Sequence, residues 1–208
     1  WSAPGAHEDA DVAVAIRALR RSRWIRRALI VDLDVHHGNG TARVFADDED
    51  VFTFSMHGAR NYPFEKPPSD RDVGLPDETT DEAYLEGLRA ELPDLMETAR
   101  PDIVFYLAGI DVAEGDRFGR LALTRAGVAR RDRIVLEHAR EANVPLTLLM
   151  SGGYARSPAA TADLHAIAHR EAARIYGSGP PASETSSVRR PETTRGRSDQ
   201  SRRSSTSA

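Results

Sequence analysis

Residues 28–40 read ALIVDLDVHHGNG, an apolar run that ends in alternating carboxylates and an imidazole before a glycine-rich turn. Because side chains alternate between the two faces of a strand, Asp32, Asp34 and His36 are expected to point the same way. The turn at 38–40 would leave these groups at the rim of a sheet, where an aspartate and a histidine two residues later can chelate one divalent ion. The stretch therefore predicts a buried strand with a metal site at its carboxyl end.

A structural role is the alternative for the same residues. Asp32 could cap the following turn, and His36 could be a core histidine satisfied by hydrogen bonds, as single residues of these types commonly are. Three ionisable groups on one face after an apolar run favour the metal site, because a buried charge is costly unless it is paired or bound to a metal.

The composition is that of a soluble globular protein, with 208 residues, 40% of them hydrophobic, and a net charge of -4. No overall basic field is present, so we expect no direct binding to nucleic acid. No apolar stretch approaches the roughly 20 residues of a membrane span, and no signal peptide is recognisable, which favours a cytoplasmic location. The sequence has no cysteine, so metal ligands must come from His, Asp or Glu.

Apolar runs alternate with helical periodicity along the chain. Strands are expected at residues 28–35, 51–56, 103–107 and 145–150, helices at 11–19, 41–46, 80–99, 124–142 and 157–175, and a long loop at 57–79. Near-continuous apolar strands that alternate with helices are typical of a parallel sheet covered on both faces. The expected fold class is therefore α/β, a layered parallel sheet with helices on both faces.

A change of composition near residue 178 predicts the domain organisation. Residues 178–208 are rich in Ser, Thr, Pro and Arg, and such a segment cannot bury enough apolar surface to offset the entropy of ordering. We expect an α/β domain over residues 1–177 and a disordered tail over 178–208. The tail is mildly basic and could contact an acidic partner, but a solvated tail is the preferred interpretation.

Polar residues follow each of the four predicted strands, where ligands bind in open parallel sheets. They are Asp34 and His36, then Ser55 and His57, then Asp111, and finally Tyr154 after a pair of glycines. Two carboxylates and one imidazole leave coordination positions free for water and a substrate oxygen, as a catalytic metal site requires. The glycine pair allows a sharp turn that would direct the Tyr154 phenol toward this opening.

Four strings carry a resemblance to a known family: VDLDVHHGNG at 31–40, FTFSMHGARNYPF at 52–64, LAGIDVAEGDRFG at 107–119 and LLMSGGY at 148–154. In this order they resemble the zinc-dependent histone deacetylase family, including its bacterial deacetylase-like and acetoin-utilisation members, over about residues 11–177. The resemblance implies an arginase/deacetylase-like fold. It also implies a hydrolase that removes acetyl groups from a protein acetyl-lysine or a small acetylated amine.

The resemblance further implies a zinc site and sites for structural monovalent cations. Asp34, His36 and Asp111 would hold zinc, and ferrous iron suits the same ligand set. A structural monovalent cation, usually potassium, would be held by Asp32, by the Ser55 hydroxyl and by nearby main-chain carbonyls.

Substrate contacts are implied in the same way. The Tyr154 hydroxyl would donate a hydrogen bond to the scissile acetyl oxygen, as a donor in an oxyanion hole does. Tyr62 and Phe64 would wall the tunnel for the acyl-lysine stem, with Gly152 and Gly153 beside the substrate. Either aromatic ring could equally pack on the edge of the core.

One element of the family pattern is missing from the sequence. Family members carry two adjacent histidines upstream of the first string, which act as general base and acid, and residues 1–30 contain no such pair. Two carboxylate ligands neutralise most of the zinc charge, so the ion would acidify water less than a three-histidine site does. Positioned proton transfer contributes on the order of 10²–10⁴ in rate. Because the chain also begins at Trp1, we expect an N-terminally truncated domain with an incomplete fold and impaired catalysis.

Two other functions remain as alternatives. A non-catalytic remnant or binding module would keep the metal cradle without the acid–base chemistry. An arginase-like hydrolase with two manganese ions is disfavoured, because Asp111 and Asp116 are separated by five positions in a glycine-containing loop. Histones, other acetylated proteins and acetylpolyamines all remain possible substrates.

Overall fold

Five parallel strands form the single sheet of this computed structural model, which describes residues 6–177. The order across the sheet is β3-β2-β1-β4-β5. The strands are β1 (Ala28–Asp32), β2 (Val51–Gly58), β3 (Arg71–Leu75), β4 (Ile103–Ala108) and β5 (Leu146–Met150). The chain winds outward from β1 to β3 and then returns to the other side of β1 with β4. The β1–β4 pair is therefore the topological switch point, where ligands bind in such sheets.

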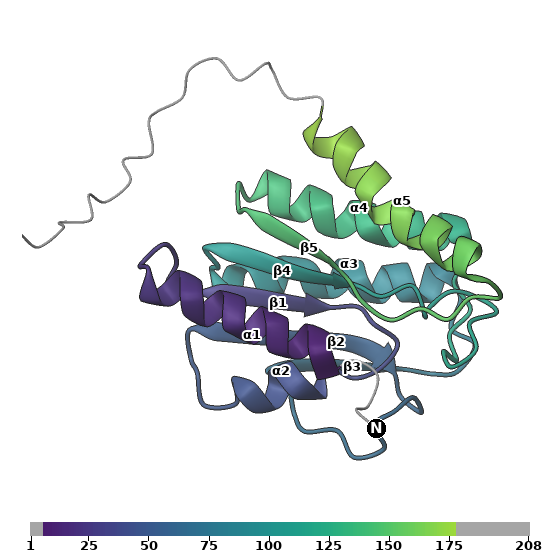
Figure 1. The fold of residues 1–208 in the computed structure, drawn as a ribbon, viewed down its shortest axis with the longest axis horizontal. Helices are drawn as coiled ribbons and strands as arrows, with labels where there is room; N and C mark the ends of the chain where they lie inside the picture. Colours follow the sequence, from purple (N-terminus) through teal and green to yellow (C-terminus); the bar gives the residue numbers. More distant parts are fainter. Residues whose placement is uncertain (1–5, 178–208) are drawn as a thin grey trace, which may run out of the picture. The chain divides into compact units, whose positions relative to one another are not determined.

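Helices cover both faces of the sheet (Figure 1). On one face lie α1 (Ala6–Arg21) and α2 (Asn39–Val44), which contact each other. On the other face α4 (Arg125–Glu141) packs between α3 (Asp81–Ala99) and α5 (Pro158–Tyr176). This arrangement confirms the expected α/β class and the layered parallel sheet.

The central strand shows why its sequence is almost continuously apolar. Leu29 and Val31 belong to the apolar cluster beneath α3 and α4, whereas Ala28 and Ile30 belong to the cluster beneath α1. All five residues of β1 are buried. A strand enclosed by helices on both faces needs apolar residues at successive positions, as predicted.

The helices follow from equally simple patterns. In α3, Leu85, Leu88, Leu92 and Leu95 recur at helical spacing and are all buried. Asp81 and Glu82 lie in its first turn, where acidic side chains favour the helix dipole. In α4, the Thr124 hydroxyl accepts a hydrogen bond from the Gly127 N–H at 3.0 Å, which caps the helix.

The prediction of a structureless loop over residues 57–79 is wrong in two respects. Strand β2 continues to Gly58, and β3 pairs with it in parallel, with Asp72 beside Ser55. The residues of β3 read RDVGL and only Leu75 is buried, because β3 lies at the edge of the sheet. A short polar edge strand has neither the apolar run nor the alternation that identifies a strand in sequence.

The opposite edge of the sheet is formed by β5, which pairs with β4 alone. Its residues LTLLM carry no charge, yet none of them is fully buried, and Met150 is 60% exposed. This edge of the sheet thus carries no charge, and its exposed residues are Thr147 and Met150.

None of the helices within residues 6–177 combines the length and apolarity that a transmembrane segment requires. The tail predicted over 178–208 lies outside the described residues.

Candidate metal centre

Asp34, His36 and Asp111 converge at the switch point between β1 and β4. The His36 Nδ1 lies 2.9 Å from Asp34 Oδ1 and 3.2 Å from Asp111 Oδ2. One ligand atom from each residue lies within 4.8 Å of the other two, and both carboxylates are buried. The structure thus brings together the three residues that the sequence predicts as one ligand set.

The backbone conformation that brings these residues together differs from the predicted strand. Strand β1 ends at Asp32, not at residue 35, so Asp34 and His36 are not presented by strand alternation. The Asp34 N–H donates to Asp32 Oδ1 at 3.0 Å, and the His36 N–H donates to Asp34 Oδ1 at 2.9 Å. Aspartates that accept from a backbone N–H two residues later bend the chain and compete with the sheet ladder. These bends, and the bond from the Val35 N–H to Asp111 Oδ1 at 2.9 Å, turn the side chains toward one another.

The loop after β5 closes one side of the cluster. Asp34 Oδ2 accepts hydrogen bonds from the Ser151 hydroxyl at 2.8 Å and from the Gly152 N–H at 2.7 Å. A Cβ at residue 152 would overlap the Asp111 carboxylate, and one at residue 109 would lie 2.7 Å from the Asp34 Cα. Glycine at these two positions lets the backbone approach both carboxylates, a role that was not predicted for either residue.

The charges of the cluster are strongly coupled. Burial and the nearby Asp34 charge raise the pKa of Asp111 to about 7. For Asp34 burial acts in the same direction, but the hydrogen bond and charge of His36 outweigh it and lower the pKa of Asp34 to about 2. Burial of His36 is likewise outweighed by Asp111 and Asp34, which raise the pKa of His36 to about 10. In the metal-free chain, the positive charge of protonated His36 therefore balances the two carboxylates. A bound metal cation would supply this positive charge instead.

The donor set fits a divalent ion. Asp111 Oδ2 is a buried oxygen that accepts no hydrogen bond of normal geometry from the described residues, and its neighbour His36 Nδ1 lies 3.2 Å away. Such an oxygen is normally paired with a donor, a water molecule or an ion. One imidazole and two carboxylates suit zinc or ferrous iron, and a set of three protein ligands leaves coordination positions open.

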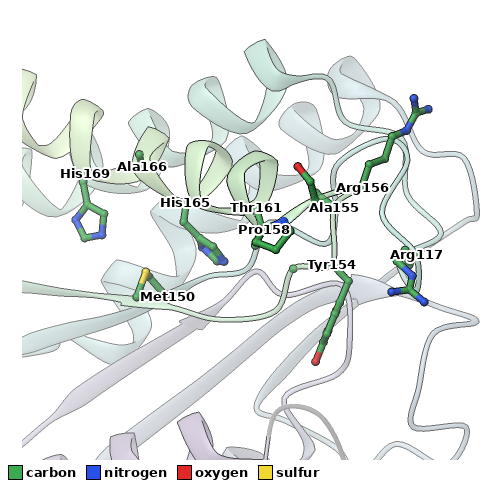
Figure 2. A pocket seen from close by; sticks show the side chains of 13 residues that line it. Arg117, Met150, Tyr154, Ala155, Arg156, Pro158, Thr161, His165, Ala166 and His169 are labelled. Atoms are coloured by element: carbon green, nitrogen blue, oxygen red, sulfur yellow. The ribbon is translucent and has the colours of Figure 1, made fainter.

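Tyr154 follows the same loop and is 41% exposed. Its N–H donates to Asp116 Oδ2 at 2.6 Å, and its ring packs edge-on against Phe118 with centroids 4.9 Å apart. Figure 2 shows its phenol pointing away from the side chains of α5. Because Gly152 contacts Asp34 directly, Tyr154 stands two residues from the carboxylate cluster.

A cavity of about 640 Å³ lies between this loop and α5 (Figure 2). Its wall includes Arg117, Met150, Gly153, His165 and His169. Asp34, His36 and Asp111 are not part of that wall, so the cavity lies beside the cluster and does not enclose it.

The residues predicted for the monovalent cation lie side by side. Asp32 and Ser55 are register partners on β1 and β2, and both are buried. Asp32 Oδ1 accepts from the Asp34 N–H, and the Ser55 hydroxyl accepts from the Gly38 N–H at 3.2 Å. Both oxygens thus face the bend that carries Asp34 and His36.

The aromatic loop lies against the same bend. The Tyr62 carbonyl accepts a hydrogen bond from the His37 N–H at 3.3 Å. Tyr62 is 43% exposed and Phe64 is 86% exposed, so neither ring is part of the core.

One residue at the site was not predicted from the sequence. Arg131 of α4 has a fully buried side chain and donates from Nη1 to the carbonyls of Leu33 and Gly109. The available signal was its spacing, because Arg131 lies on the buried stripe of α4 with Val128 and Val135. A charged residue on such a stripe must have buried partners.

Comparisons with known proteins identify the family of this chain. The family model described as "Histone deacetylase domain" matches residues 10–169, which is most of the chain. The chain belongs to the histone deacetylase family. A relative in Picosynechococcus, an uncharacterized protein, is 45% identical over 166 residues, which cover 80% of this chain and 55% of the relative. Histone deacetylase 2 of Arabidopsis thaliana is 38% identical over 153 residues, covering 72% of this chain and 40% of the relative.

Two solved structures share the fold of this chain. The histone deacetylase Clr3 has a TM-score of 0.64 at 27% identity, over 86% of this chain and 32% of Clr3. An acetylpolyamine aminohydrolase from Burkholderia pseudomallei has a TM-score of 0.63 at 23% identity, over 80% of this chain and 48% of that enzyme. The chain thus spans about half, or less, of the length of the relatives it matches.

Proposed function

We propose that this chain carries the metal-binding half of a zinc-dependent amide hydrolase that removes acetyl groups from acetyl-lysine or related acetylated amines. The observation that carries the proposal is the convergence of Asp34, His36 and Asp111 around buried carboxylate oxygens. Asp34, His36 and Asp111 would hold the ion, with zinc favoured and ferrous iron compatible. Asp32 and Ser55 would hold a monovalent cation that stabilises the neighbouring bend.

The metal would supply Lewis-acid polarisation of the acetyl carbonyl. The residues of the chain would supply orientation. The Tyr154 hydroxyl would donate to the acetyl oxygen as negative charge develops there, a type of contact that is worth about 10²–10³ in rate. The backbone at Gly152 and Gly153 lets the loop stand close to the reacting group, and Tyr62 and Phe64 would flank the aliphatic stem of the substrate.

Proton transfer would be the weak step. The sequence carries no pair of adjacent histidines ahead of β1, and the imidazole of His36 is engaged by two carboxylates. Without a positioned base and acid, turnover is expected to fall by on the order of 10²–10⁴ relative to complete family members. We therefore propose a chain that binds metal and turns over acetyl-lysine poorly by itself.

Metal content and turnover test this proposal together. Purified chain and its Asp34→Ala variant are loaded with zinc and dialysed, and bound zinc is measured beside deacetylation of an acetyl-lysine reporter. We expect the variant to bind one equivalent less than the original chain, and the original chain to show low turnover. Equal zinc content in the two proteins would refute the ligand set. Metal-dependent turnover as fast as that of a complete relative would refute the impairment.

The second candidate is a non-catalytic metal-binding module of the same family. The ligand cluster favours it, because metal binding at Asp34, His36 and Asp111 requires no acid–base residues. Zinc binding with no detectable deacetylation, even at high enzyme concentration, would decide for this alternative.

A further inference from the structure

A second group of metal-ligating side chains lies beyond the bend, and it shares no residue with the Asp34 cluster. His37 lies in the segment after β1, His57 near the end of β2, and Asp72 on β3. One ligand atom from each lies within 4.8 Å of the other two. Three segments of the chain therefore meet at two imidazoles and a carboxylate.

The contacts inside this group are specific. His37 Nε2 lies 3.0 Å from Asp72 Oδ1, and the rings of His37 and His57 meet edge-to-face with centroids 4.7 Å apart. His57 Nδ1 lies 3.0 Å from the Ser55 hydroxyl. Bonds from zinc to nitrogen or oxygen are about 2 Å long, so modest rotations of these side chains would let all three share one ion.

Hydrogen bonding alone does not satisfy the group. His37 is buried, and its Nδ1 has no hydrogen-bond partner among the described residues. Leaving a buried polar atom unpaired costs about 1–3 kcal/mol. The ring nitrogen that faces Asp72 is Nε2, and an ion could take the place of the proton that these two atoms share.

The surroundings provide orientation and access. The Ser69 N–H donates to Asp72 Oδ2 at 2.9 Å, which fixes this carboxylate and leaves Oδ1 facing His37. The Asp72 side chain is 31% exposed, so an ion can reach the group from solvent on this side. A ligand held by a second hydrogen bond is typical of protein metal sites.

One nearby charge opposes a cation. The positive charge of Lys66 interacts electrostatically with both His57 and Asp72. Its ammonium group donates hydrogen bonds to the carbonyls of Ala59, Asn61 and Pro63. Those carbonyls hold the ammonium in the loop after β2. Removing this charge should therefore strengthen binding of a cation at the group.

We propose that His37, His57 and Asp72 form a second divalent-metal site, of the nitrogen-and-oxygen type that zinc and its neighbours in the first transition series prefer. The site is structural. It ties β3 and the end of β2 to the bend that presents His36, and so fixes the segment next to the proposed zinc ligand. It goes beyond the proposed function, because it requires neither a substrate nor the Asp34 cluster.

Zinc stoichiometry of the full chain tests the proposal. Zinc is titrated into metal-free protein, and bound ion is measured after equilibrium dialysis for the original chain, Asp34→Ala, Asp72→Asn and Asp70→Asn. Asp70 is the matched control, because this neighbouring carboxylate accepts from the Thr53 N–H and hydroxyl and takes no part in the group. We expect two equivalents for the original chain and for Asp70→Asn, and one for each of the other two variants.

The outcomes separate the two sites. One equivalent that is lost in Asp34→Ala and kept in Asp72→Asn overturns the second site and leaves the proposed function standing. One equivalent that is lost in Asp72→Asn and kept in Asp34→Ala supports the second site and overturns the zinc ligands of the first. Should Asp72→Asn not fold, His57→Asn replaces it, because the shorter amide can keep the contact with Ser55 while removing the imidazole.

Lys66→Met provides an independent check. The second zinc ion should bind several-fold more tightly to this variant, whereas binding at the Asp34 cluster should not change. An unchanged or weaker second affinity would count against the site.

Discussion

Arg131 Nη1 lies 2.5 Å from the carbonyl oxygen of Gly109. The same nitrogen donates to the Leu33 carbonyl at 3.2 Å, so one buried cation joins the segments that follow β4 and β1. Leu33 directly precedes Asp34, and Gly109 stands two residues before Asp111. The charge of Arg131 is balanced by Asp132 Oδ1 at 2.7 Å, which also accepts from the Tyr106 hydroxyl at 2.6 Å. The guanidinium thus fixes the distance between the backbone segments that carry Asp34 and Asp111, two of the proposed metal ligands.

Replacing this guanidinium should lower both the stability of the fold and the affinity for zinc. Arg131→Met leaves Asp132 buried without its counter-charge, a change that typically lowers the free energy of unfolding by about 3–5 kcal/mol. We also expect weaker zinc binding, because the carbonyls of Leu33 and Gly109 lose their shared donor. Urea unfolding of the metal-free chain and zinc competition with a chelator measure the two effects.

A second variant separates charge burial from positioning. Arg131→Met combined with Asp132→Leu removes both charges and should recover much of the stability without recovering zinc affinity. Arg130→Met is the control, since Arg130 forms an exposed ion pair with Glu82 and should change neither quantity measurably. Recovery of zinc affinity together with stability would show that Arg131 has no positioning role.

Gly152→Ala should weaken zinc binding without unfolding the chain. The added methyl group would overlap the Asp111 carboxylate and lie 2.5 Å from Asp34 Oδ2, so both ligands must shift. Disturbing the groups that orient ligands typically lowers metal affinity 10–100-fold, and we expect about that loss in chelator competition. Gly74→Ala is the matched control, because its methyl group would make an ordinary 3.4 Å contact with Ala59. A Gly152→Ala variant with unchanged affinity would place the ion away from Asp34 and Asp111.

Zinc binding should release protons. Asp111 and Asp34 raise the pKa of His36 to about 10 in the metal-free chain, so the ion must displace a proton from this imidazole near pH 8. Affinity should therefore increase with pH up to about that pKa. Calorimetry in buffers of different ionisation enthalpy should give about one proton released per ion at this site, measured in the Asp72→Asn background. No proton release would mean that His36 is neutral before the metal binds.

Acid stability should depend on His57. Burial and the neighbouring His37 lower the pKa of His57 to about 4, whereas the unfolded chain has the ordinary value of 6.5. Between these values the unfolded state binds more protons, so the contribution of His57 to stability is lost as the pH falls from 6.5 to 4. The expected loss is up to about 3 kcal/mol.

The comparison with His57→Asn isolates this effect. Asp111 titrates over the same range with the opposite sign, because its pKa is raised, but it does so in both proteins. The stability of the metal-free chain minus that of the variant, from urea unfolding at several pH values, should therefore decrease on acidification. A difference that is independent of pH would contradict the lowered pKa.

The fold could be predicted from sequence wherever a strand or helix carries an apolar pattern. Strands β1, β2, β4 and β5 are apolar runs, and α3 shows its leucine stripe plainly. Strand β3 could not be found, because it lies at an exposed edge of the sheet. Residues such as Arg71 and Asp72 need not be apolar there, so the strand has no apolar pattern. The end of β1 was missed because the Asp32 and Asp34 side chains capture backbone N–H groups and bend the chain earlier than its apolar pattern suggests.

Some residues of the candidate site could also be predicted from the sequence, and others could not. Asp34, His36 and Asp111 could be predicted together, since each follows a strand and parallel strands end on one edge. Arg131 could not, because its partners are main-chain carbonyls 98 and 22 residues away in sequence. Asp72 joins His37 and His57 only through β3, so a site that depends on that strand is invisible without the sheet register.

The two edge strands of the sheet differ in charge. Arg71 and Asp72 place charges along β3, a common protection against pairing with another molecule, whereas β5 offers LTLLM with no charge. Two copies that paired through β5 about a two-fold axis would form a closed dimer, with the charged β3 edges left outside. We expect any self-association of this chain in concentrated solution to begin at β5, and Thr147→Lys to reduce it, because a charge on an edge strand opposes pairing with another molecule.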